Sequence, residues 1–113
     1  MALYFEADDP RKLLGEFCKA IKEGKIVTWS RDDDGDFTHT PIQWRNKAWL
    51  RPKIEDGQLS LYIVSPKNTA LSSLAYAIYH GRFLESMLVH CDQFFTTSTA
   101  TAMPIGSDNP SGN

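Results

Sequence analysis

The strongest constraint on the fold is a β-hairpin signal in the middle of the chain. Asp56-Gly57 stands between the run Ala48 to Ile54 and the run 58–65, in which apolar and polar residues alternate. Asp-Gly is favoured in two-residue hairpin turns because glycine adopts positive φ without strain, and alternation with period two is typical of a half-buried strand. We therefore predict an antiparallel pair of strands at 48–54 and 58–65.

Three other segments have the composition of strands. Ile26 to Trp29 is β-branched and aromatic, and the polar run Arg31 to Asp36 after it predicts a turn. Phe37 to Trp44 then reads as a returning strand, with Pro41 at an edge or a bulge because proline cannot donate to the sheet. Near the C-terminus, 94–102 is rich in threonine and aromatic residues and predicts a last strand.

Two segments have apolar residues at helical spacing. Asp9-Pro10 is a helix-start signal and Gly24 a stop signal, so we predict a first helix at 10–23. The second helix is expected at about 69–91, and these residues make up its predicted core stripe: Leu71, Leu74, Ala75, Ile78, Leu84, Leu88 and Cys91. Gly81 lies on this stripe, which fits either close approach of a strand backbone or a break of the helix at His80-Gly81.

Together these elements predict an α+β fold in the order α-β-β-β-β-α-β. We expect a two-layer sandwich in which an antiparallel sheet of four to five strands carries both helices on one face and leaves the other face partly free. Residues 1–105 are long enough for a single domain with its own core. The segment 106–113 has no apolar residue and is predicted to be a disordered tail.

Charge and hydropathy restrict the classes of partner. The formal net charge of the 113 residues is −2, so no overall basic field favours nucleic acid or acidic membranes. No apolar run approaches the roughly 18 residues of a membrane span, and the first nine residues lack the cationic and apolar segments of a secretory signal. We therefore expect a cytoplasmic protein without a membrane partner, in which Cys18 and Cys91 are reduced.

The residues that metals and covalent catalysis use are scattered along the chain. On one helix, His80 and His90 would be separated by about 15 Å of rise, too far apart to share a metal ion. No phosphate-binding loop, nucleophile elbow or paired metal-protease histidines occur. The sequence thus predicts no catalytic residue, no metal site and no cofactor, and it leans against an enzyme.

A second stripe runs along the predicted second helix beside its core stripe. Its members are aromatic, sulfur-containing or histidine residues spaced three or four apart: Tyr76, His80, Phe83, Met87 and His90. Such a stripe is typical of a wide buried face, but aromatic and methionine residues are also enriched at interfaces. Core packing and an interface or pocket with Tyr76 and His80 as its polar groups are therefore both open.

A basic segment with aromatic residues spans 44–53. As a strand it would place Trp49 on one face with Arg51 and Lys53, and Arg45 and Lys47 precede it. Cations around an aromatic ring can bind a stacked base or an acidic partner. The alternative is a solvated sheet face whose charge is balanced by Asp32 to Asp36.

These patterns do not determine a function. The hypothesis with the fewest requirements is a noncatalytic protein-interaction or regulatory module that pairs with a protein partner or with itself as a homodimer. Binding of nucleic acid or an acidic partner through 44–53 is the first alternative. A small enzyme or ligand carrier with a pocket at Tyr76 and His80 is the second.

Overall fold

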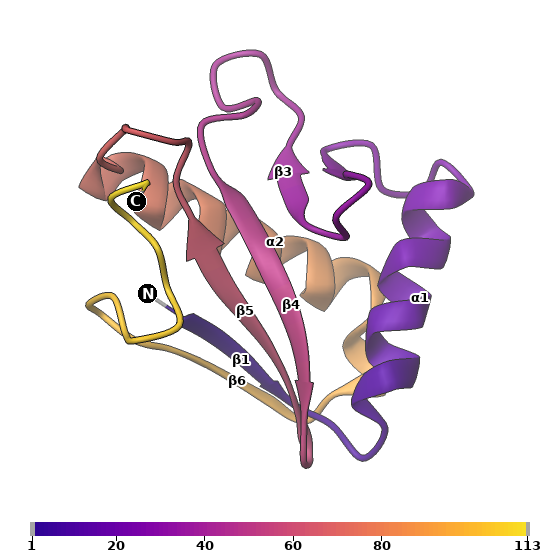
Figure 1. Cartoon of the computed structure of the whole chain (residues 1–113). Helices are drawn as coiled ribbons and strands as arrows, with labels where there is room; N and C mark the ends of the chain where they lie inside the picture. Colours follow the sequence, from indigo (N-terminus) through magenta and orange to yellow (C-terminus); the bar gives the residue numbers. More distant parts are fainter. Residues whose placement is uncertain (1, 113) are drawn as a thin grey trace.

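Six antiparallel strands form one sheet in the computed structural model, which describes residues 2–112 (Figure 1). In chain order the elements are β1 (Ala2–Glu6), α1 (Pro10–Lys22), β2 (Trp29–Arg31), β3 (Phe37–His39), β4 (Trp49–Glu55), β5 (Gln58–Val64), α2 (Ser73–His90), the short 3-10 helix η1 (Asp92–Phe94) and β6 (Thr97–Ala100). Across the sheet the strands run β2-β3-β4-β5-β1-β6. This arrangement confirms the predicted α+β class with an antiparallel sheet and two helices.

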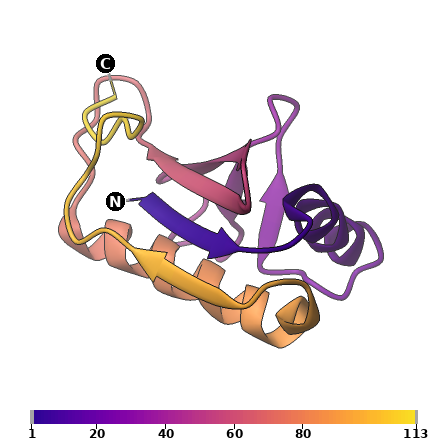
Figure 2. The ribbon, with the colours of Figure 1, turned by 90° about the horizontal axis from the view of Figure 1, so that it is seen from below.

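Both helices pack on the same face of the sheet. Leu3 of β1, Leu50 of β4 and Leu61 of β5 belong to one buried cluster with Phe17 of α1 and Phe83 of α2. Figure 2 shows α2 lying along the sheet as an outer layer, with no other segment of residues 2–112 on the side of the helix away from the sheet. One side of α2 therefore builds the core, and its other side faces solvent.

The local turn and cap signals of the sequence act as expected. The β4–β5 hairpin turns at Asp56-Gly57, where Gly57 has φ +73°, and Trp49 to Glu55 pair in register with Gln58 to Val64. Asp9 caps α1 by accepting a hydrogen bond from the Lys12 amide (3.1 Å). Gly24, with φ +77°, follows the helix and lets the chain turn back.

Other boundaries differ from the predictions. β1 is absent from the predicted order, yet it lies between β5 and β6 in the sheet. The predicted strand 37–44 ends at His39, the last strand covers only Thr97–Ala100, and the second helix begins at Ser73 rather than at 69. That helix starts late because the Ser72 hydroxyl accepts from the Ala75 amide (3.1 Å), and it continues unbroken through Gly81.

Most of the segment that the sequence predicts to be a disordered tail lies against the end of β5, and its residue 113 is outside the described residues. The Asn109 amide donates to the Ile63 carbonyl (2.8 Å), and the Ser65 amide donates to the Asn109 carbonyl (2.8 Å). The Ile63 amide donates to the Asp108 carboxylate (2.9 Å). These bonds satisfy backbone groups of β5 beyond the point where β1 begins.

The burial of the His39 ring predicts that the stability of the fold depends on pH. Its Nδ1 donates to the Thr28 carbonyl (2.7 Å), its ring stacks on Trp29 (4.6 Å between centroids), and burial lowers its pKa. The folded state therefore holds the neutral ring, and stability falls as the pH drops below the ordinary pKa of about 6.5, by at most about 1.4 kcal/mol per pH unit. Urea unfolding from about pH 7.5 to about pH 5.5 should show this loss.

The matched variants for this measurement are His39→Gln and His90→Gln. His39→Gln should reduce the change of the free energy of unfolding with pH. His90→Gln should leave this change as it is, because His90 is exposed at the end of α2. Equal curves for His39→Gln and the unchanged protein would contradict this prediction.

Candidate interaction surfaces

The aromatic stripe of α2 faces the core of the chain. Phe83 and Met87 are fully buried, and Tyr76 and His80 are only 7% and 4% exposed. The His80 Nδ1 donates to the Tyr76 carbonyl (2.7 Å), and the centroids of the two rings lie 4.9 Å apart. His90 is exposed, so the structure does not bring the five residues of the stripe to one surface.

The predicted core stripe of α2 is divided. Ala75 and Cys91 are buried, and Leu71 and Leu84 pack against the core as partly buried residues, whereas other members face solvent. Leu74 is 63% exposed and Leu88 is 52% exposed. Ile78 and Leu84 are half-buried, and Ala77 and Gly81 are exposed. We call these six residues the α2 outer face: Leu74, Ala77, Ile78, Gly81, Leu84 and Leu88.

The aromatic stripe therefore takes the core role that was one of its two interpretations, and the predicted core stripe is buried only in part. Successive residues of a helix turn by about 100°, which places Gly81 at the centre of the outer face and Tyr79 and Phe83 on the opposite side. Both predicted explanations of Gly81 are wrong, because the helix is continuous and no atom of another element lies within 4 Å of the point where a Cβ would stand. The fold of one chain thus gives no packing reason for a glycine here.

The basic segment is divided between a loop and β4. Arg45 and Lys47 are exposed in the loop that precedes β4, whereas Trp49, Arg51 and Lys53 share the sheet face away from the helices. Lys53 lies 3.7 Å from the Glu55 carboxylate. The segment therefore does not form one continuous cationic surface.

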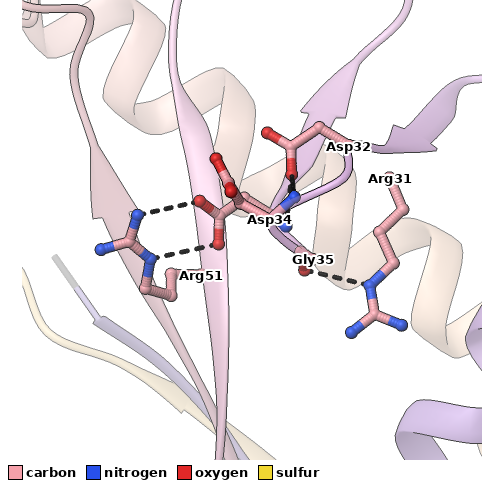
Figure 3. A network of polar contacts seen from close by, with 6 residues as sticks. Arg31, Asp32, Asp34, Gly35 and Arg51 are labelled. Atoms are coloured by element: carbon pink, nitrogen blue, oxygen red, sulfur yellow. Dashed lines mark hydrogen bonds and ion pairs between the residues drawn. The ribbon is translucent and has the colours of Figure 1, made fainter.

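Arg51 is held by the acidic turn between β2 and β3 (Figure 3). Its Nε and Nη2 donate to the two carboxylate oxygens of buried Asp36 (3.1 and 2.9 Å), and these bonds raise the pKa of Arg51. The turn is organised by Asp32, whose carboxylate accepts from the amides of Asp34 (3.0 Å) and Asp36 (2.9 Å). The charge balance between the basic segment and Asp32 to Asp36 is thus confirmed for Arg51.

This pairing predicts different effects of neutralising two cations of the basic segment. Arg51→Ala leaves the buried Asp36 carboxylate without its bidentate partner and should lower the free energy of unfolding by about 1 kcal/mol, a modest value because the Arg51 side chain is 58% exposed. Lys47→Ala, in the loop, should change it by less than about 0.5 kcal/mol. Urea denaturation compares the two variants, and equal losses would contradict a structural role for Arg51.

Several cavities lie on the surface of residues 2–112. One of about 440 Å³ is polar and open, and its lining includes Glu6, Asp8 and Asp56. Another, of about 250 Å³, lies between the loop before β4 and the start of α2. Of four cavities within residues 2–112, none has Tyr76 or His80 in its lining, and the one of about 250 Å³ reaches the neighbouring Ala75. The predicted pocket therefore has no counterpart in these cavities.

Within residues 2–112 the structure shows neither a metal-binding cluster nor a membrane-spanning helix. No group of three or more His, Cys, Asp or Glu side chains is arranged to hold a metal ion. No helix in this part of the chain has the length and apolar character needed to cross a membrane. Within residues 2–112, packing gives no account of the exposed apolar residues of the α2 outer face, and Val27, Ile42, Val89 and Met103 are exposed as well.

Comparison with protein-family models, with curated proteins and with solved structures gave no match.

Proposed function

We propose that this chain is a noncatalytic protein-interaction module that binds its partner through the α2 outer face. The observation that carries the proposal is an apolar surface that runs along the exposed side of α2, from Leu74 to Leu88. Apolar surface in water is unfavourable, and its burial stabilises a complex by about 25 cal/mol per Å² before the costs of association. A helix that is apolar on both sides is typical of one with a partner on each side.

The spacing of the outer face indicates the kind of partner. Leu74, Ala77, Gly81, Leu84 and Leu88 follow one another at intervals of three or four residues, the spacing of a helix-packing seam. A seam of this kind packs against the apolar side of another helix. The other two hypotheses have less support, since Arg51 is bound within the fold and the cavities do not include His80.

The proposal predicts that the α2 outer face contributes to binding and not to folding. Leu74→Gln/Leu88→Gln keeps helix propensity and should change the free energy of unfolding at low protein concentration by less than about 0.5 kcal/mol. The same variant should bind less of the dye anilinonaphthalene sulfonate, a probe of exposed apolar surface. Val27→Gln, at an exposed apolar residue outside α2, is the control and should keep the dye signal of α2.

Two results would overturn the proposal. A loss of about 2 kcal/mol or more in Leu74→Gln/Leu88→Gln would place these leucines in the packing of the chain itself. Dye binding equal to that of the unchanged protein would show that the α2 outer face does not accept apolar ligands.

A further inference from the structure

We infer that the partner is a second copy of this chain and that the two α2 helices cross antiparallel at Gly81. This inference rests on the proposed function. The first argument is the symmetry of the α2 outer face. Leu74 and Leu88 each lie seven residues from Gly81, and Ile78 and Leu84 each lie three residues from it. In a two-fold interface the same patch serves both protomers, so residue i must meet j where j meets i. The pattern meets that condition, because Leu74 of one copy faces Leu88 of the other at both ends.

The second argument is Gly81 itself. Glycine inside a helix costs about 1 kcal/mol relative to alanine, and no other element within residues 2–112 lies within 4 Å of the position where its Cβ would stand. At the centre of a helix crossing, however, a residue without a side chain lets two backbones approach closely. The two-fold axis of the proposed dimer passes between the two copies of Gly81, which accounts for glycine at this position.

The third argument is charge complementarity along one side of the seam. Arg82 and Glu85 are both exposed beside the outer face. With a rise of 1.5 Å per residue, an antiparallel partner brings its Arg82 to about 7.5 Å along the axis from Glu85, within reach of two extended side chains. A parallel two-fold pair would instead place Arg82 and Glu85 of the two copies on opposite sides of the seam, where these charges would not meet. Pairing of Arg82 with the partner's Glu85 is therefore open only to the antiparallel direction, which also brings the two Arg82 residues about 3 Å apart along the axis.

The size of the surface sets the strength of this dimer. α2 has 18 residues, which corresponds to a length of about 27 Å, and a helix is about 10 Å wide. The projected contact of about 270 Å² is well below the roughly 800 Å² per partner that stable interfaces bury. The dimer is accordingly expected to be weak and to dissociate on dilution.

Cysteine cross-linking tests both the partner and the direction. Leu74→Cys and Leu88→Cys are made as separate proteins, each with Cys18→Ser, and are oxidised with diamide alone and as a mixture. The native Cys91 is buried and stays in place. The antiparallel dimer predicts a disulfide-linked pair in the mixture and little in either protein alone. Val27→Cys mixed with Leu88→Cys is the control and should give no linked pair, since Val27 lies outside α2.

Each other outcome has a defined meaning. Linked pairs in each single protein, and not in excess in the mixture, would overturn the antiparallel direction. Absence of linked pairs in the mixture would overturn the second copy as partner. The proposed function is then tested by dye binding alone. A face that binds the dye but forms no linked pair would leave the proposed function standing, with a different protein as the partner.

Gly81→Ala provides a second measurement, because it should stabilise the single chain and weaken the dimer. A methyl group here meets open space within one chain, so the free energy of unfolding at low concentration should rise by about 1 kcal/mol, which is about a fivefold change in the folding equilibrium. The same methyl group separates the two helices at the crossing, so dimer dissociation should increase severalfold. A variant that is more stable and associates as well as the unchanged protein would overturn the crossing at Gly81.

Discussion

Phe83→Ala is expected to lower the free energy of unfolding by about 3 to 5 kcal/mol, the range measured for large aromatic residues in protein cores. Phe83 is fully buried at the centre of the aromatic core. The centroid of its ring lies 4.7 Å from that of Phe17, 5.1 Å from that of Trp29 and 5.6 Å from that of Phe37. Truncation therefore opens a cavity where α1, α2, β2 and β3 meet, and rigid neighbouring rings cannot collapse to fill it.

Thermal unfolding followed by circular dichroism measures this effect. A loss of this size corresponds to a fall in the midpoint on the order of 15 °C for a domain of this length. Leu88→Ala is the matched control on the other side of the same helix, and at low concentration it should change stability by less than about 0.5 kcal/mol. Similar losses for the two variants would contradict the assignment of core and outer faces on α2.

Leu74→Glu/Leu88→Glu is expected to abolish self-association while leaving the fold intact. At each end of the antiparallel seam, the carboxylate introduced at position 74 of one copy would face the carboxylate introduced at position 88 of the other, so two like charges would be desolvated together. A total penalty above about 2.8 kcal/mol raises the dissociation constant at least about 100-fold. Sedimentation velocity at a concentration where the unchanged protein associates should then show only the monomer.

A charge-reversal control separates this effect from general loss of apolar surface. Leu74→Glu/Leu88→Lys places opposite charges at both ends of an antiparallel seam and should retain more association than Leu74→Glu/Leu88→Glu. Equal dissociation of the two variants would contradict the antiparallel pairing, and association of both like that of the unchanged protein would place the interface elsewhere on the chain.

The parts of the fold that could be predicted from the sequence depend on short-range signals. Asp56-Gly57 specifies a hairpin because its turn preference is local, and Asp9-Pro10 begins α1 because a cap needs only neighbouring amides. β1 carries no such signal. Its five residues are held by β5 and β6, whose partner residues are more than fifty positions away in the sequence, so its place depends on tertiary pairing.

The predicted core stripe of α2 was right only in part, for a different reason. Both of its stripes recur at helical spacing, so periodicity alone gives two candidate core faces. The structure buries the aromatic stripe at Phe83, whose ring packs against Phe17 of α1, and it also buries Tyr79, whose ring packs against Trp29 of β2. Side-chain volume, rather than aliphatic character, would have been the useful criterion, since a small domain fills its core most effectively with large aromatic residues.

Part of the candidate site could also be read from the sequence. The balance of the basic segment by the acidic run is found as the Arg51–Asp36 pair, because the β2–β3 turn lies beside β4 in the sheet. The α2 outer face could not be recognised in the same way, since its leucines resemble core residues until the opposite side of the helix is known to be buried.

The most direct test of the interaction function is the solution mass of the unchanged protein over a hundredfold range of concentration, measured by light scattering after gel filtration. We predict that the mass rises from the 12.8 kDa of one chain toward twice that value as the concentration increases. A mass of 12.8 kDa at every concentration, with no dye binding at the α2 outer face, would contradict the account.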